Sequence, residues 1–287
     1  MPNMINDQQV VEFIRLALDE DVHTGDYSTL SCIPSDAVGQ AELKVKQEGI
    51  LAGVQMAKYI FHYLEPNCLF EQYLNDGAKV KVGDIAFSVK AGVHTILKAE
   101  RLALNVMQRM SAIATLTAEY VKAVEGTRAV ILDTRKTTPL NRFLEKWAVR
   151  IGGGQNHRMG LYDMIMLKDN HIDFAGGITK AVMATKQFLE AQHLALKIEV
   201  ETRNLEEVQE AISLAAVDRI MLDNFSIEDM RAAVILIAGK VEVEASGGVN
   251  LDSVRAIAAS GVDFISVGAL THGVKSMDLS LKAQVYS

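Results

Sequence analysis

Cysteine is scarce in this chain of 287 residues, which contains only Cys32 and Cys68. Two cysteines 36 positions apart form neither a metal-type nor a redox-type pair, and they cannot build a disulfide framework. We therefore expect both thiols to be reduced and without a chemical role. This usage is typical of a cytoplasmic protein.

Long apolar runs and an excess of positive charge are also missing. No segment approaches the ~18 uninterrupted apolar residues of a membrane span. The first residues, MPNMINDQQVVEFI, lack the basic and apolar regions of a signal peptide. The formal net charge of −7 disfavours nonspecific binding to nucleic acid, so a site for a polyanion must be a local basic pocket. With 49% hydrophobic and 23% charged residues, the chain has the composition of a soluble globular protein.

The first part of the chain has the pattern of a small α+β unit. Residues 8–20 carry apolar side chains at helical spacing. Residues 40–95 alternate in short segments that are separated by turn signals such as Asp76-Gly77 and Gly83-Asp84. A long helix is predicted over roughly 96–124. Its buried stripe is predicted to consist of Leu102, Val106, Met110 and Ile113. Its polar face is predicted to consist of Arg101, Asn105 and Gln108.

From residue 126 on, a strand–tip–helix pattern repeats six times without a low-complexity linker. Such alternation predicts parallel strands with helical crossovers. The predicted fold is α/β: a small N-terminal α+β sandwich domain and an open, incomplete (β/α) barrel of about six parallel strands. The predicted limits are 1–110 for the first domain with its linking helix, 111–273 for the barrel, and 274–287 for a segment that packs back on the first domain. The predicted strands are 129–132, 164–167, 194–200, 219–222, 241–244 and 263–267, and the clearest helices are 176–190, 204–215, 226–238 and 250–260.

Charged and glycine residues gather where these strands end. The chain has no glycine-rich first turn of a dinucleotide-binding sheet. Barrel enzymes place their chemistry at the carboxyl ends of the strands, so we expect one shared pocket there. The residues at these ends are Asp133, Arg135 and Lys136; Lys168 to His171; Glu199 and Glu201; Asp223 and Asn224; Glu244, Ser246, Gly247 and Gly248; and Ser266 and Gly268. The segment GGGQNHRMG adds His157 and Arg158, and the sum predicts a site for a phosphorylated, carboxylated substrate.

Each motif also has a purely structural explanation. Arg135-Lys136 could be a solvated loop, and Thr138 with Pro139 has the form of a helix start, with Thr138 as the N-cap and Pro139 at the first helical position. The three glycines at 152–154 could be a flexible turn. His157 could be a buried structural histidine or a metal ligand, although no second histidine at ligand spacing supports zinc.

The carboxylates of the third predicted strand favour a functional interpretation. Glu199 and Glu201 are two residues apart and face the same side of the strand. Inward carboxylates there, with Asp223, could hold Mg²⁺ or sugar hydroxyls. The loops EASGGV and SVGAL could cradle a phosphate with backbone N–H groups, or could be tight turns only.

Several motifs occur together, in order, over essentially the whole chain. They are DEDVHTGDYST, GILAG, ERLALNVMQRMSAIAT, DTRKTTP, EKWAVRIGGGQNHRMGLYDMIMLKDNHI, EVE, LDN, EASGGV and GVDFISVGALTH. This combination resembles the quinolinate phosphoribosyltransferase family, also called nicotinate-nucleotide pyrophosphorylase (carboxylating). The resemblance implies a small α/β sandwich beside an open barrel. It also implies Mg²⁺ as cofactor, and a homodimer or a hexamer built as a trimer of dimers, with active sites shared between subunits.

The resemblance further implies an activity and a role for each matching residue. The family transfers phosphoribosyl from phosphoribosyl pyrophosphate to quinolinate, with loss of CO₂, in de novo NAD synthesis. Quinolinate would be bound by Arg101, Arg135, His157 and Arg158, and the catalytic groups would be Lys136, Lys168, Glu201 and Asp223. Glu201 and Asp223 would also hold Mg²⁺ and the ribose hydroxyls. Ser246, Gly247, Gly248 and Gly268 would cradle the 5′-phosphate.

The sequence departs from the family's usual motifs at two places, and two other functions are also considered. Leu140-Asn141 follow DTRKTTP where the family usually has glycine, and Ser111-Ala112 replace the usual SG. One rival is a phosphoribosyltransferase-like protein associated with molybdate transport, against which KDNH and GGGQNHR argue. The other is a catalytically silent binding protein on the same scaffold, against which the intact Lys136, Lys168, Glu201 and Asp223 argue. No partner of nucleic acid or membrane is expected.

Overall fold

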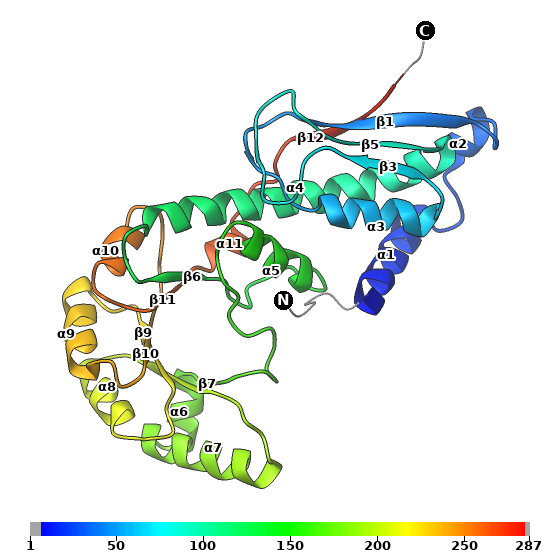
Figure 1. The fold of residues 1–287 in the computed structure, drawn as a ribbon. Helices are drawn as coiled ribbons and strands as arrows, with labels where there is room; N and C mark the ends of the chain where they lie inside the picture. Colours follow the sequence, from blue (N-terminus) through cyan, green and yellow to red (C-terminus); the bar gives the residue numbers. More distant parts are fainter. Residues whose placement is uncertain (1–6, 285–287) are drawn as a thin grey trace. The chain divides into compact units, whose positions relative to one another are not determined.

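The structure, a computed structural model, describes residues 7–284. Residues 1–6 and 285–287, which the predicted domain limits and the signal-peptide prediction include, lie outside the described residues. The chain divides into two compact units (Figure 1). The first comprises residues up to 116, 143–152 and from 274 on, and the second comprises 117–142 and 153–273.

The first unit is built on a four-stranded antiparallel sheet with the order β12-β1-β5-β3. These strands are β1 (Val38–Val45), β3 (Leu69–Gln72), β5 (Ile85–Gly92) and β12 (Leu279–Ala283), and a separate pair is formed by β2 (Gly49–Ile50) and β4 (Lys79–Val80). Helix α3 (Val54–Leu64) and the first part of α4 (Val93–Ala123) lie against one face of the sheet (Figure 1). Phe61 of α3 meets Phe87 of β5 edge to face, with ring centroids 6.1 Å apart.

Helices α1 (Asp7–Val22), α2 (Tyr27–Cys32) and α5 (Arg142–Ile151) complete the first unit. The grouping of α5 with this unit differs from the division predicted at residue 110. Two contacts join α5 to this unit: Arg109 Nη2 of α4 lies 3.0 Å from Oε1 of the fully buried Glu145, and the ring of Phe143 meets that of Phe13 of α1 edge to face. The predicted stripe of α4 is confirmed, because Leu102, Val106, Met110 and Ile113 are all buried.

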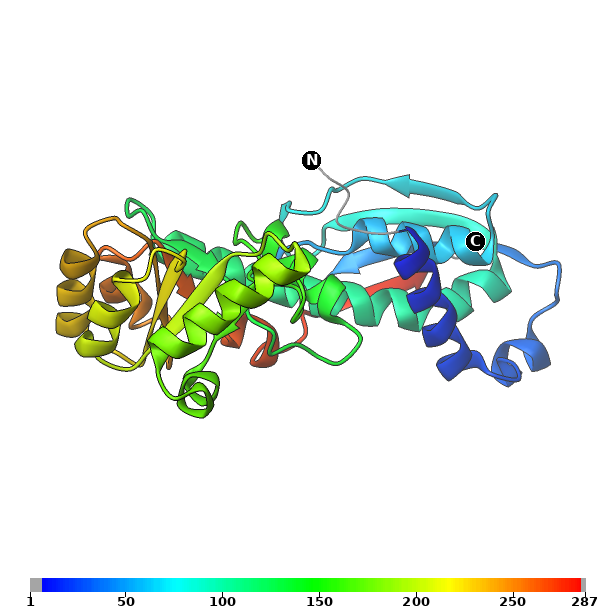
Figure 2. The same cartoon turned by 90° about the horizontal axis from the view of Figure 1, so that it is seen from below.

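The second unit contains a six-stranded parallel sheet with the order β6-β11-β10-β9-β8-β7, which confirms the predicted open α/β barrel. The strands are β6 (Val130–Leu132), β7 (Ile165–Leu167), β8 (Ile198–Thr202), β9 (Arg219–Asp223), β10 (Glu242–Ser246) and β11 (Phe264–Ser266). The helices are α6 (Asp169–Ala175), α7 (Ile178–Gln192), α8 (Leu205–Ile212), α9 (Ile227–Ile237), α10 (Val254–Ala258) and α11 (Ala269–His272). Helices α7 to α10 lie on the outer side of the strands (Figures 1 and 2).

The sheet does not close, because β6 and β7 are its two edges. The segment that follows the three glycines adds to the β6 edge. The N–H of Gln155 donates to the carbonyl of Ile131 (2.9 Å), and the N–H of Asp133 donates to the carbonyl of Gln155 (3.2 Å). This bridge carries residues 156–158 to the carboxyl end of β6, beside the Arg135-Lys136 loop.

One predicted helix start is wrong. Pro139 lies in a turn rather than in the first turn of a helix, and α5 begins three residues later, at Arg142. The cause is Leu140, whose φ of 67° is left-handed and cannot continue a right-handed helix. Within residues 7–284, no helix combines the length and the apolar character that crossing a membrane requires.

Replacing Leu140 by glycine should stabilise the protein. Leucine is strained at this φ, whereas glycine is not, and the exposed side chain contributes little packing. The gain should be about 0.5–1 kcal/mol in the free energy of unfolding, after the greater entropy of glycine in the unfolded chain is subtracted. Urea unfolding would measure it. Leu140→Ala is the matched control because it keeps the β-carbon, and an equal gain from alanine would refute the explanation by strain.

Candidate functional site

The cations predicted after β6 and in the 155–158 segment come together at one edge of the barrel. Burial, and second to it the positive charge of Arg135, lower the pKa of Arg158 below its usual range. The Nη1 of Arg158 donates to the carbonyl of Met164 (3.1 Å). The Nε of Arg135 is buried and has no hydrogen-bond partner within residues 7–284. A buried guanidinium donor without a partner is costly unless an anion satisfies it.

Asp133 ties these two cationic segments together. The carboxylate, fully buried at the end of β6, accepts the N–H of His157 (2.9 Å) and the side-chain amide of Asn156 (2.5 Å). Asp133 lies two residues before Arg135, and its partners Asn156 and His157 lie just before Arg158. Its carboxylate therefore links the two segments that carry Arg135 and Arg158.

The predicted site residues Lys168, Glu201 and Asp223 lie at the ends of the neighbouring strands. Lys168 Nζ lies 2.7 Å from Glu201 Oε2, which joins the ends of the adjacent strands β7 and β8. Asp223 is in register with Ser246 across β9 and β10. The side chain of Lys136 lies beside Gly268, because a β-carbon added there would approach Lys136 Cδ to 3.2 Å. The hydroxyl of Thr271 donates to the carbonyl of Lys136 (2.7 Å).

Gly247 has a steric reason to be glycine. Its φ is 95°, and an added β-carbon would lie 2.2 Å from Asn224 Oδ1 and 2.8 Å from the backbone nitrogen of Asn224. The N–H of Asn224 donates to the carbonyl of Ser246 (2.9 Å). Only glycine therefore lets the loops after β9 and β10 approach each other so closely, and Asp223 is held next to the predicted phosphate loop.

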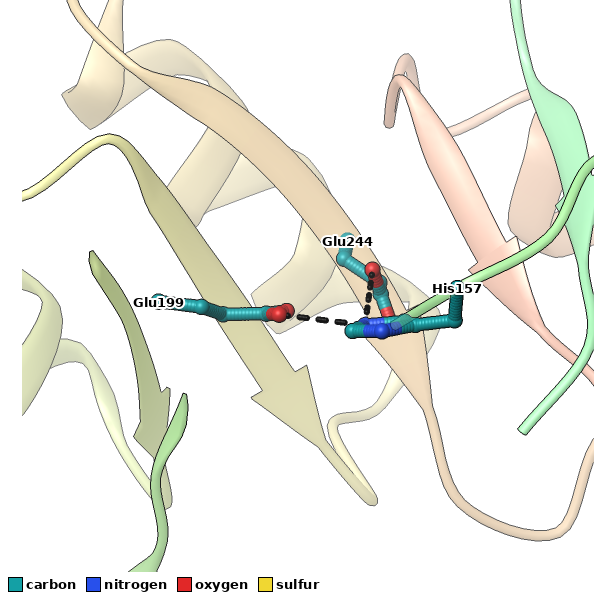
Figure 3. Close-up of side chains that lie close together, drawn as sticks. All are labelled: His157, Glu199 and Glu244. Carbon is teal, nitrogen blue, oxygen red and sulfur yellow. Dashed lines mark ion pairs between the residues drawn. The ribbon is translucent and has the colours of Figure 1, made fainter. Parts of the chain in front are cut away.

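His157 is held from inside the barrel (Figure 3). Its Nε2 lies 3.1 Å from Glu199 Oε2 and 3.3 Å from Glu244 Oε2, and both carboxylates are fully buried. Its Nδ1 accepts the N–H of Arg158 at 2.7 Å. The prediction that His157 binds quinolinate stays a prediction, since both ring nitrogens have partners within the chain.

Arg219 completes this buried group, to which we refer as the His157 cluster: His157, Glu199, Glu244 and Arg219. Arg219 Nη1 lies 2.8 Å from Glu244 Oε2, and its Nη2 lies 3.0 Å from Glu242 Oε2. The guanidinium stacks 4.0 Å from the centroid of the Phe264 ring, and Ser266 Oγ donates to Glu244 Oε1. The sequence patterns named Glu199 and Glu244 as strand-end residues but assigned them no role beside His157, and they did not single out Arg219.

The cluster takes up a proton when the chain folds. Burial alone would lower the pKa of His157, but Glu199 and Glu244 outweigh it and raise that pKa to about 9. Burial and the charge of Glu244 raise the pKa of Glu199 to about 7. A proton on Nδ1 would face the N–H of Arg158, so we place the added proton on Glu199 while that hydrogen bond persists. In either position it neutralises the cluster.

Metal binding is a second possibility for the same atoms. His157, Glu199 and Glu244 are the one group of at least three such residues in the described part of the chain whose ligand atoms lie within 4.8 Å of one another. Arg219 already supplies a positive charge to Glu244, so the geometry is that of an ion-pair network. Glu201 and Asp223, predicted to hold Mg²⁺, offer carboxylate oxygens at the ends of adjacent strands, and such oxygens suit that ion.

Because both pKa values are raised on folding, the stability that the added proton provides is present at low pH and lost as pH rises. The added proton belongs to the coupled pair of His157 and Glu199, so its window runs from the unfolded pKa of histidine, about 6.5, to the folded value of about 9. Glu199→Gln removes the need for this proton. Wild type should therefore lose about 1–3 kcal/mol relative to Glu199→Gln between pH 6.5 and 9. Urea unfolding across this pH range would measure it, with Glu206→Gln, at an exposed position of α8, as control. Parallel curves for wild type and Glu199→Gln would exclude a shared proton.

The comparisons with known proteins cover both units. Residues 26–111 match the N-terminal domain of quinolinate phosphoribosyl transferase, and residues 113–282 match its C-terminal domain. Nicotinate-nucleotide pyrophosphorylase [carboxylating] of Arabidopsis thaliana is 48% identical over 284 residues, which cover 94% of this chain and 81% of that protein. The probable nicotinate-nucleotide pyrophosphorylase of Synechocystis is 44% identical over 268 residues, 92% of this chain and 89% of that one.

The fold matches solved structures equally well. The nicotinate-nucleotide pyrophosphorylase from Francisella tularensis superposes with a TM-score of 0.91 at 41% sequence identity, covering 98% of each chain. The two domain matches, the similar proteins and the open barrel all indicate the same family as the motifs at the strand ends. The chain belongs to the quinolinate phosphoribosyltransferase family.

Proposed function

We propose that this protein transfers the phosphoribosyl group from phosphoribosyl pyrophosphate to quinolinate, a step of de novo NAD biosynthesis. Family membership supports the reaction. The observation that supports the substrate is Arg135, whose buried Nε has no hydrogen-bond partner among residues 7–284 and whose charge, second to burial, lowers the pKa of Arg158. Quinolinate carries two adjacent carboxylates. Planar guanidinium groups bind carboxylates in a forked arrangement, so two of them suit this dianion.

The proposed reaction breaks two bonds and forms two. The ring nitrogen of quinolinate bonds to the anomeric carbon of the ribose as pyrophosphate leaves with the bonding electron pair. The carboxylate next to the ring nitrogen then leaves as CO₂, and a proton takes its place on the ring carbon. The products are nicotinate mononucleotide, pyrophosphate and CO₂. No covalent nucleophile is required.

The residues at the strand ends divide the remaining work. We assign Lys136 and Lys168 to phosphoribosyl pyrophosphate and to the negative charge that builds on the leaving group. Backbone groups of Ser246, Gly247, Gly248 and Gly268 would hold the 5′-phosphate. The proximity of Lys136 to Gly268, and of Asp223 to the Ser246 loop, supports this arrangement.

Magnesium fits the same strand ends. Glu201 and Asp223 would hold it together with the substrate, because carboxylates are the hard oxygen donors that Mg²⁺ prefers. When bound, the ion supplies positive charge near the pyrophosphate. Glu201 is also paired with Lys168, and Asp223 Oδ2 accepts the side-chain amide of Asn224 (2.7 Å), so both carboxylates are held in place in the chain itself.

We also propose that the protein works in the cytoplasm, which its two free cysteines support. The rival functions, a molybdate-associated homologue and a silent binding protein, have no observation in their favour. The domain matches name quinolinate phosphoribosyl transferase, and the lysines and carboxylates of the proposed site are all present.

Substrate choice is the first test of this function. The protein should convert quinolinate with Mg²⁺ and phosphoribosyl pyrophosphate, releasing one CO₂ per nicotinate mononucleotide, and should convert nicotinate poorly. Nicotinate has one carboxylate and would leave a buried guanidinium unpaired, which should cost about 100-fold or more in kcat/KM. Product chromatography and trapped ¹⁴CO₂ would measure both reactions. Equal kcat/KM for nicotinate would refute the proposed dicarboxylate site.

Arg101 is proposed to serve the barrel of a partner subunit in a homodimer or a hexamer. It is exposed on the polar face of α4, in the first unit, with Asn105 beside it on that face. A symmetric dimer can supply such a residue to the partner's site. The alternative is a surface arginine that pairs with a nearby acid such as Glu100.

Subunit mixing separates these alternatives. Arg101→Ala and Lys168→Ala should each be inactive alone, but each mixed dimer would contain one site with both defects and one intact site. Activity should return toward roughly half of wild type per mixed dimer. Mixing Arg135→Ala with Lys168→Ala is the matched control and should restore nothing, because both residues belong to one barrel. No recovery in the first mixture, with subunit exchange verified, would place Arg101 outside a shared site.

A further inference from the structure

The His157 cluster is a buried charged group to which the proposed reaction gives no direct role. Glu199 and Glu244 have no solvent exposure, and Arg219 and His157 are nearly as buried. Carboxylates are seldom fully buried unless they are paired. Glu244 is paired three times over, with His157, Arg219 and Ser266. This arrangement calls for an explanation beyond packing.

The imidazole of His157 links the barrel interior to the backbone of Arg158. On one side Nε2 meets Glu199 and Glu244, at 3.1 and 3.3 Å (Figure 3). On the other side Nδ1 accepts the backbone N–H of Arg158 at 2.7 Å. The direction of the ring therefore determines where the backbone of Arg158 lies, and the two carboxylates determine the direction of the ring.

Several contacts hold the segment that carries Arg158. They are the hydrogen bond from Arg158 to Met164, the bonds of Asp133 to Asn156 and His157, and the bond from the N–H of Arg158 to the ring of His157. Burial and, second to it, the positive charge of Arg135 lower the pKa of Arg158. A fixed position for Arg158 therefore has to offset the desolvation of its charge and the like charge of Arg135.

We infer that Glu244 and Glu199 are positioning residues of the quinolinate site, which act through the ring of His157 to hold Arg158 beside Arg135. Neither carboxylate touches the substrate. Arg219 Nη1 holds one oxygen of Glu244, and Ser266 Oγ holds the other. The inference rests on the proposed function, because it assumes that Arg135 and Arg158 bind the two carboxylates of quinolinate.

The kinetic test uses Glu244→Gln, which keeps the shape of the side chain and removes its charge. The KM for quinolinate should rise roughly 10-fold or more, whereas the KM for phosphoribosyl pyrophosphate should stay within roughly twofold of wild type. Glu242→Gln is the matched control. Glu242 pairs with the same Arg219 but does not contact His157, so its loss should leave both KM values unchanged.

A purely structural role for Glu244 predicts a different result. The variant would lose thermal stability, while its folded fraction would keep the wild-type KM for quinolinate, and that result would overturn the inference. If Glu244→Gln yields no folded protein, Glu199→Gln makes the same test, because it leaves the Arg219–Glu244 ion pair in place. An unchanged quinolinate KM in folded Glu199→Gln would equally overturn it.

A double-mutant cycle tests whether the carboxylate acts through His157. His157→Asn keeps an acceptor near the position of Nδ1 but cannot reach Glu244. It should raise the quinolinate KM by itself, and adding Glu244→Gln should then have no further effect. Additive effects would show that Glu244 acts by another route.

Wild-type turnover of quinolinate is the reference for all of these variants. Its absence would refute the proposed function, whereas its presence with an unchanged variant KM would refute this inference alone.

Discussion

The contacts of His157 Nε2 with the buried carboxylates Glu199 and Glu244 connect the interior of the barrel to the edge that carries the proposed site. Charged groups buried this deeply contribute little net stability, because the desolvation of the charges offsets their attraction. We therefore assign these contacts a geometric role. They orient one imidazole, which in turn orients the backbone of Arg158. The barrel has charged residues in its interior at positions where Val, Ile or Leu would pack without the free-energy cost of desolvating a charge.

The open edge of the barrel explains why such support is needed. Arg135 and Arg158 come from a loop and from an irregular segment, not from the middle of strands, and their like charges repel. Gln155 pairs with the edge strand β6, Asp133 holds the loop from one side, and the His157 cluster holds it from the other. In the proposed site these contacts would hold the two guanidinium groups in advance, so that they need not reorganise when a dicarboxylate binds.

Much of this architecture could be predicted from the sequence, because strand and helix periods differ and parallel strands end at one edge. The burial of Leu102 and Met110 on α4 and the alternation of Glu199 and Glu201 on β8 are consequences of those periods. Sequence periods describe only residues that are close together in the chain. They could not show that Glu199 and Glu244, 45 residues apart, meet His157, because that contact depends on the order of the strands in the sheet. The same limit applies to α5, whose place in the first unit depends on the pair between Glu145 and Arg109. The prediction of a helix start at Thr138-Pro139 was wrong because the sequence did not reveal the left-handed backbone of Leu140, after which α5 begins only at Arg142.

The most direct measurement of the central claim is a crystal structure of the protein with quinolinate bound. The account predicts that Nε2 of His157 stays within ion-pair distance of Glu199 and Glu244, at about 3 Å, while the guanidinium groups of Arg135 and Arg158 bind the two carboxylates. A His157 ring that has turned away from Glu199 and Glu244 to donate from Nε2 to quinolinate would contradict it.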